Sequence, residues 1–250
     1  MEYDNFCDLE VSHKQEWNIE VRLARRWEEI DIENGQVRGI HLVFIDASHK
    51  RMHCWIKSTL IEQLDAKFVP GEMYAIHNFI VAPFTEKYKC FEADKQIILT
   101  NLTIVTKLQG SYSLIPQNVF EFTNLKKIPT AEEQDTHLID IVGIVQNVQP
   151  ISPVTRGLNK AHRVIKFEVT DLIHNVNICF WDDFATNFED EYNEQLDHPV
   201  ILTISSCRMI RNNYTGLTTV RNASATSFEM NANVERVQTL RSRFWEVHGI

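Results

Sequence analysis

The chain has 250 residues, of which 44% are hydrophobic and 24% are charged, and its net charge at neutral pH is −9. This length suits one large globular domain or two modest ones, and no apolar run approaches the roughly 18 residues of a membrane-spanning helix. The N-terminal stretch MEYDNFCDLEVSHKQEW is acidic and polar, unlike a secretory signal, so we expect the protein to stay inside the cell.

Metal, cofactor and catalytic motifs are missing from the sequence. The five cysteines form no C-x-x-C pair, and the ten histidines show no H-E-x-x-H spacing. Neither G-x-x-x-x-G-K-[ST] nor G-x-S-x-G occurs. We therefore expect a protein that is not an enzyme, with no metal, no cofactor and no small-molecule substrate.

The first half consists of short β-branched and aromatic segments separated by turns, which predicts β-strands. A helix is expected after the third strand, over residues 58–68, because Leu60, Leu64 and Phe68 recur at helical spacing and Thr59 and Glu62 fit a capping box. The expected strands are WNIEVRLARRW (17–27), GIHLVFIDA (39–47), RMHCWIK (51–57), EMYAIHNFIV (72–81), KYKCFEA (87–93) and IILTNLTIV (97–105).

The second half repeats the same order of parts after a polar, turn-rich stretch. Asp46 and Asp171 each end a strand, the next strand ends in or carries a tryptophan, and a helix follows, here DDFATNFEDEY (182–192). The final residues NANVERVQTLRSRFWEVHGI predict a closing helix. The expected strands are LIDIVGIVQNV (138–148), RVIKFEVTD (163–171), NVNICFW (175–181), PVILTISSCRMI (199–210) and YTGLTTV (214–220).

This shared order predicts a duplicated unit of about a hundred residues. Five strands with a helix after the third are the layout of the oligonucleotide/oligosaccharide-binding (OB) fold, a partly open Greek-key barrel. The fold class is thus all-β, with two tandem OB barrels. The expected parts are a tail over 1–14, a first OB domain over 15–110, a linker over 111–135, a second OB domain over 136–230 and a C-terminal helix over 231–250.

Two tryptophans lie on the polar faces of their strands. Strand alternation puts Trp55 with Arg51 and Lys57, and puts Trp181 opposite the apolar side of its strand. Each is followed 33 residues later by a tyrosine, Tyr88 or Tyr214. Exposed aromatics beside basic groups are typical of single-strand binders, whose bases stack on them. The alternative is that the tryptophans cap the barrels or pack under loops.

Basic residues gather near these strands although the net charge is negative, and the acidic excess lies in other segments. We expect a basic groove on an acidic body, with weak affinity for duplexes. The candidate phosphate contacts are Arg22, Arg25, Arg51, Lys57, Lys87, Lys89, Arg156, Arg163, Arg208 and Arg211.

These segments resemble the large subunit of replication protein A over its two central OB domains, roughly residues 15–245. The similarity lies in WNIEVRLARRW, HLVFIDASHKRMHCWI, HLIDIVGIVQNV and FEVTDLIHNVNICFWDDFATNF, and GEMYAIHNFIVAPFTEKYKCF is similar to the plant branch. The resemblance does not extend to the family's N-terminal partner-recruiting domain or its C-terminal zinc-containing domain.

The resemblance implies sequence-tolerant binding of single-stranded DNA in replication, repair or recombination, in the nucleus, with other replication protein A subunits or repair proteins as partners. It implies stacking on Trp181 and Tyr88 and aligns Ile40 with a family aromatic, so that either Trp55 substitutes for that aromatic or the first domain binds more weakly. Two alternatives stay open: a protein-interaction module with reduced DNA binding, and a binder of single-stranded RNA or telomeric overhangs.

Overall fold

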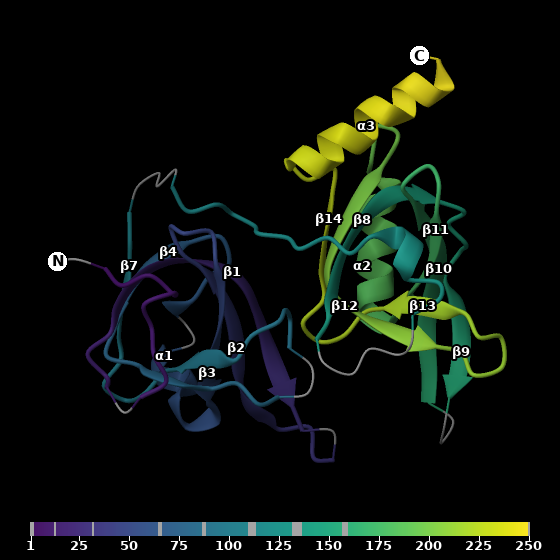
Figure 1. The fold of residues 1–250 in the computed structure, drawn as a ribbon. Helices are drawn as coiled ribbons and strands as arrows, with labels where there is room; N and C mark the ends of the chain where they lie inside the picture. Colours follow the sequence, from purple (N-terminus) through teal and green to yellow (C-terminus); the bar gives the residue numbers. More distant parts are fainter. Residues whose placement is uncertain are drawn as a thin grey trace. The chain divides into compact units, whose positions relative to one another are not determined.

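A computed structural model describes residues 3–12, 14–31, 33–64, 67–86, 89–109, 114–131, 137–156 and 160–249, leaving out the side chains of 156 and 160. The chain divides into two compact units, one from Met1–Glu86 with Glu92–Val119 and the other from Lys87–Phe91 with Phe120–Ile250. Both are rich in strands, as the sequence predicts (Figure 1). Within the described ranges, no helix has the length and apolar character needed to cross a membrane.

The first unit is a curled sheet with the strand order β5-β6-β3-β2-β1-β4-β7. Only two residues separate β4 from β5, although these strands lie near opposite ends of that order. The sheet therefore curls so that its two ends approach each other, as in the partly open barrel of the OB fold. Its strands are β1 (Asn18–Ile30), β2 (Val37–Ile45), β3 (Arg51–Lys57), β4 (Met73–His77), β5 (Ile80–Pro83), β6 (Lys95–Ile98) and β7 (Ile104–Lys107).

The helix expected over residues 58–68 begins as predicted, with η1 (Ser58–Leu60) and α1 (Ile61–Leu64), and Lys67 is helical as well. Residues 65 and 66 lie outside the described part, and no side chain caps η1. The expected capping box is thus wrong. Leu64 and Phe68 are buried in the core of the first unit, as their helical spacing predicts.

The second unit is a closed barrel, because β8, β10, β11, β13 and β12 pair in a ring. β9 pairs with the first residues of β10, so Arg156 and Arg163 lie in a hairpin of two strands. The elements are η3 (Leu125–Lys127), β8 (Ile139–Gln146), β9 (Ser152–Arg156), β10 (Lys160–Thr170), β11 (Asn175–Trp181), α2 (Asp182–Asn193), β12 (Ile201–Arg211), β13 (Thr218–Arg221), β14 (Ser227–Met230) and α3 (Glu235–His248).

The duplicated order of parts is visible in one hairpin turn of each unit. In the β2–β3 turn, Asp46 accepts hydrogen bonds from the backbone N–H groups of Ser48 and Lys50. In the β10–β11 turn, Asp171 accepts from those of Ile173 and His174. An aspartate that bonds to backbone two or more residues ahead is a common turn device, and here it sets the same hairpin in both units.

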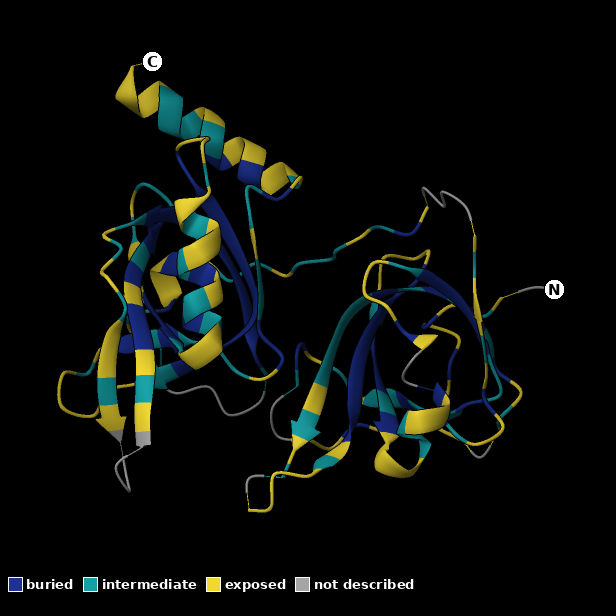
Figure 2. Cartoon of the chain, turned by 180° about the vertical axis from the view of Figure 1, so that it is seen from behind, coloured by how far each residue is buried: buried dark blue, intermediate teal, exposed yellow. Residues whose placement is uncertain are grey.

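Each unit buries its own apolar core, and Figure 2 shows the buried inner strands in dark blue. The segment expected to be an N-terminal tail contributes to the first core, since Phe6 and Leu9 are buried there. In the second unit, α3 covers β8 and β12 through Val237 and Leu240, as expected for a closing helix.

Candidate nucleic-acid interface

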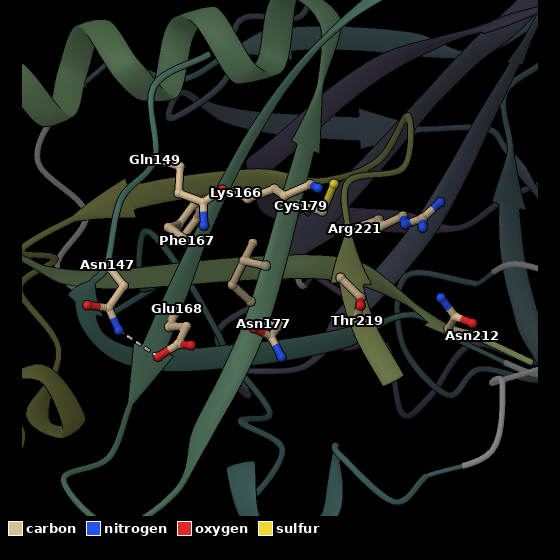
Figure 3. Close-up of a pocket in the computed structure, with 11 residues that line it drawn as sticks. Asn147, Gln149, Lys166, Phe167, Glu168, Asn177, Cys179, Asn212, Thr219 and Arg221 are labelled. Carbon is tan, nitrogen blue, oxygen red and sulfur yellow. Dashed lines mark hydrogen bonds between the residues drawn. The ribbon is translucent and has the colours of Figure 1, made fainter. Parts of the chain in front are cut away.

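A groove of about 330 Å³ lies on the outer face of the second barrel, across β10, β11 and β13 (Figure 3). Alternate residues of these strands, such as Phe180 and Val220, point into the core, so the residues between them point outward. We call this hollow the β10–β13 groove. Its polar lining includes Asn147, Gln149, Lys166, Glu168, Asn177 and Arg221.

Three cationic residues form a row across the strands at this face. Arg208 on β12 is paired with Arg221 on β13, which lies beside Cys179 on β11, and Cys179 is paired with Lys166 on β10. Neighbouring strands are about 4.8 Å apart, so the row carries positive charge across the width of the face. Lys166 is exposed and the two arginines are half-buried. Such a row can neutralise the phosphates of a strand that crosses it.

Trp181 lies at the end of β11, next to this row. Its backbone N–H donates to Oδ1 of Asn222 at 2.9 Å, and the guanidinium carbon of Arg221 is 5.4 Å from the centre of its indole. The ring of His162 approaches at 5.9 Å, edge to face. The indole is half-buried, which leaves part of its surface for a base to stack on.

None of the sequence candidates of the second half is in the groove lining itself; Trp181 and Arg208 lie beside it, and the others lie elsewhere. Arg163 forms an ion pair with Asp183 at the start of α2. Tyr214 and Arg211 are exposed at the β12–β13 turn, and Tyr214 is fully exposed. The backbone of Arg156 belongs to β9, and its side chain lies outside the described part. Their roles in binding stay predictions.

Sequence reasoning missed Lys166, Glu168, Asn177 and Arg221. The first three lie on expected strands at outward positions, so strand alternation alone could have found them. Arg221 directly follows the expected strand 214–220. It lies beside Cys179 because β11 pairs in parallel with β13. No local pattern reveals that pairing.

In the first unit, Trp55 belongs to a row of three rings on the outer face. Trp27 on β1 is paired with His41 on β2, and His41 is paired with Trp55 on β3. The Trp27 and His41 rings are stacked with their centres 5.0 Å apart, and the His41 and Trp55 rings are 4.5 Å apart. The two indoles are half-buried and His41 is buried. Trp27, which sequence reasoning missed as a site residue, is the counterpart of Trp55 in this row.

Gly39 provides the space in which the Trp55 indole lies. A Cβ atom at Gly39 would be 2.2 Å from Cη2 of Trp55 and 2.5 Å from the backbone oxygen of Ile56. We expect Gly39→Ala to displace the indole and to lower the free energy of unfolding by about 1–3 kcal/mol, as overpacking does. Tryptophan fluorescence followed through a urea titration measures both effects.

Gly35→Ala is not a matched control for this substitution, because Gly35 has positive φ. Ala82→Gly on β5 instead reports the effect of a glycine–alanine exchange elsewhere in the same unit. A variant with the wild-type spectrum and midpoint would contradict this prediction.

His41 makes the stability of the first unit depend on pH. Burial lowers the pKa of His41, and Glu29, whose Oε2 is 3.5 Å from Nε2 of His41, opposes this only in part. The folded state therefore holds the imidazole neutral while the unfolded chain takes up a proton near pH 6.5, so stability falls as pH drops below that value. We expect the midpoint of thermal unfolding to fall less between pH 7.5 and 5.5 in His41→Phe than in the wild type. An equal fall of the unfolding midpoint in the wild type and in His41→Phe would contradict this prediction.

The basic candidates of the first unit are spread along its outer face. Arg22 donates from Nε to the backbone oxygen of Ile115 at 3.0 Å and from Nη1 to that of Gly71 at 2.7 Å, so it holds loops in place. Arg51 and Arg25 are half-buried on the same face, and Lys57 is exposed at the end of β3. Lys89 groups with the second unit, where its backbone oxygen accepts from Leu138 at 2.7 Å. Lys87 and Tyr88 lie outside the described residues.

Ile40 does not face outward. Its side chain is 1% exposed and lies in the first core. The outward position next to it on β2 is His41, which shares a ring row with Trp55. The ring on this part of β2 therefore belongs to His41 and not to residue 40.

Comparison with known proteins shows similarity to replication protein A in both sequence and fold. The family model described as a domain of unknown function, DUF223, matches residues 10–130. A replication protein A 70 kDa DNA-binding subunit of Oryza sativa subsp. japonica is 23% identical over 205 residues, covering 77% of this chain, and one of Arabidopsis thaliana is 22% identical over 174 residues, covering 68%. A solved replication protein A heterotrimer bound to ssDNA shares the fold with a TM-score of 0.65 and 13% identity over 98% of this chain and 55% of that chain.

The chain has the OB fold and is similar to the replication protein A 70 kDa subunits. It spans only part of the replication protein A subunits it matches, 31% of the rice protein and 22% of the Arabidopsis one. Within that span, the replication protein A likeness covers both units. The β10–β13 groove and the Trp27–His41–Trp55 row lie on their outer faces.

Proposed function

We propose that this chain binds single-stranded DNA without strict sequence preference, by stacking bases on its outer-face aromatics and neutralising phosphates with nearby cations. The observation that supports this most is the row of Arg208, Arg221 and Lys166, of which the last two line the β10–β13 groove and Arg221 lies beside the half-exposed indole of Trp181. The relatives named as DNA-binding subunits and the neighbour solved with ssDNA support the same function.

We also propose a cellular role for this chain. A chain of this kind acts in the nucleus, in replication, repair or recombination, and its partners are other replication protein A subunits or repair proteins. Stacking and phosphate neutralisation require no covalent step, so the protein works as a binder and not as an enzyme. Co-purification of the tagged protein from nuclear extract with and without nuclease treatment separates direct protein partners from those joined by DNA.

Fluorescence anisotropy with labelled oligo-dT, at two or more salt concentrations, tests the binding. Each phosphate neutralised on a single strand contributes about −0.7 to the slope of log K against log salt. Arg221→Gln is expected to reduce the magnitude of that slope by about 0.7, while Lys126→Gln, an exposed lysine in η3, leaves it unchanged. Duplex DNA of equal length is the control for non-specific charge attraction.

Absence of oligo-dT binding at low salt would overturn the proposal and favour a protein-interaction module. Competition with unlabelled oligo-U measures the choice between DNA and RNA. Tighter binding of the ribo-oligonucleotide would replace single-stranded DNA with RNA as the ligand.

A further inference from the structure

A carboxylate lies among the cations of the β10–β13 groove. Glu168 follows Lys166 by two residues on β10, so both side chains point to the same face, about 6.6 Å apart along the strand. Figure 3 shows Lys166 extended toward Cys179 and Arg221, and Glu168 turned the other way, toward Asn147. The groove thus has a cationic end and an acidic, amide-rich end.

Three side-chain amides fix the orientation of the Glu168 carboxylate. Its Oε2 accepts from Nδ2 of Asn147 at 3.0 Å, from Nε2 of Gln146 at 3.3 Å and from Nδ2 of Asn175 at 3.4 Å. In the part of the chain that the structure describes, every hydrogen bond recorded for this carboxylate ends on Oε2, and no ion pair involves it. Oε1 is therefore an acceptor that the surrounding amides leave to a ligand.

A phosphate group would be repelled from this end of the groove, because Glu168 carries a negative charge that no described cation pairs. Lys166 and Arg221 attract phosphate at the other end. A nucleotide that lies along the groove therefore puts its phosphate near the cations and its base near Glu168. Asn177 is paired with Glu168 across β10 and β11 and is exposed, so its amide can reach the same base.

The chemistry of a carboxylate distinguishes between bases. A carboxylate only accepts hydrogen bonds, and the exocyclic amino group of cytosine is a donor that it recognises. Thymine has a carbonyl oxygen at the same position, which faces a carboxylate unfavourably. We propose that Glu168, with Asn177, makes the β10–β13 groove prefer a base with an exocyclic amino group, so that cytosine binds more tightly than thymine; this rests on the proposed binding of single-stranded DNA.

Anisotropy titrations of the full chain with labelled oligo-dC and oligo-dT of equal length, at one salt concentration and slightly alkaline pH, test this preference. We expect the wild type to bind oligo-dC about fivefold or more tightly than oligo-dT, the discrimination typical of one good base contact. Glu168→Gln keeps the shape of the side chain and adds an N–H donor for the thymine carbonyl. The variant is expected to lose or invert the preference.

Glu191→Gln is the matched control, since Glu191 is exposed on α2 and lies outside the groove lining. It should keep the wild-type ratio of affinities. Equal binding of the two oligonucleotides by the wild type would overturn this preference and leave the proposed function intact. A Glu168→Gln variant that keeps the preference would overturn the role of Glu168. Failure of both oligonucleotides to bind would overturn the preference together with the proposed function.

Discussion

Replacing Trp181 by alanine is expected to weaken binding of oligo-dT by about 1–3 kcal/mol, a five- to 150-fold rise in Kd. The half-buried indole gives one base a surface to stack on, and the guanidinium of Arg221, 5.4 Å from the ring centre, can hold a phosphate nearby. Anisotropy titration of the wild type and the variant at the same salt concentration measures the loss. Trp181→Phe, which keeps a smaller flat ring, should recover part of the affinity.

Trp245→Ala is the matched control for that experiment. Trp245 lies on α3, where the centre of its ring is 5.2 Å from that of Phe244, and α3 packs on β8 and β12 rather than beside the cation row. Its removal should leave oligo-dT affinity unchanged. A Trp181→Ala variant that stays folded and binds as tightly as the wild type would show that the indole packs the barrel rather than stacking on DNA.

Replacing the neighbouring Phe180 by alanine is expected to lower the free energy of unfolding of the second unit by about 3–5 kcal/mol. The Phe180 side chain is completely buried, and its ring centre is 4.7 Å from that of Phe184 and 5.2 Å from that of Phe167. The cavity left by the ring is enclosed by β10 and α2, which cannot collapse freely. Urea denaturation followed by circular dichroism measures the change.

Tyr214→Ala serves as the control for stability, because Tyr214 is fully exposed and such changes stay within about 0.5 kcal/mol. The two alanine variants on β11 also test the strand itself. Residues 180 and 181 point to opposite faces, so one substitution should reduce stability and its neighbour should reduce binding. If Phe180→Ala cost no more stability than Tyr214→Ala, the packing assigned to the inward face would be wrong.

The parts of the fold that follow from local patterns could be predicted from the sequence. Strand alternation, the aspartate turns at Asp46 and Asp171, and the helical spacing of Phe184, Phe188 and Tyr192 all act within a few residues. They identified two tandem OB barrels, α2 and the outward side of Trp181. The spacing of Leu64 and Phe68 likewise identified two residues that are buried in the first core.

The candidate groove depends on contacts between distant segments, which no local pattern contains. Arg208 and Arg221 are 13 residues apart, and Lys166 is 55 residues before Arg221; only the pairing of four strands puts them in one row. The burial of Phe6 and Leu9 is of the same kind, because two apolar residues in a polar stretch give no periodic signal. Arg22 was predicted from its charge, and its hydrogen bonds to Ile115 and Gly71 depend on loops far along the chain.

The assignment of residues 89–91 to the second unit affects how the protein can be dissected. The backbone oxygens of Lys89 and Cys90 accept hydrogen bonds from the N–H of Leu138 and the hydroxyl of Ser206, although the chain on either side, up to Glu86 and from Glu92, belongs to the first unit. A fragment that began at residue 120 would lack both acceptors. The two barrels are therefore interleaved in sequence, and no single cleavage point yields both of them whole.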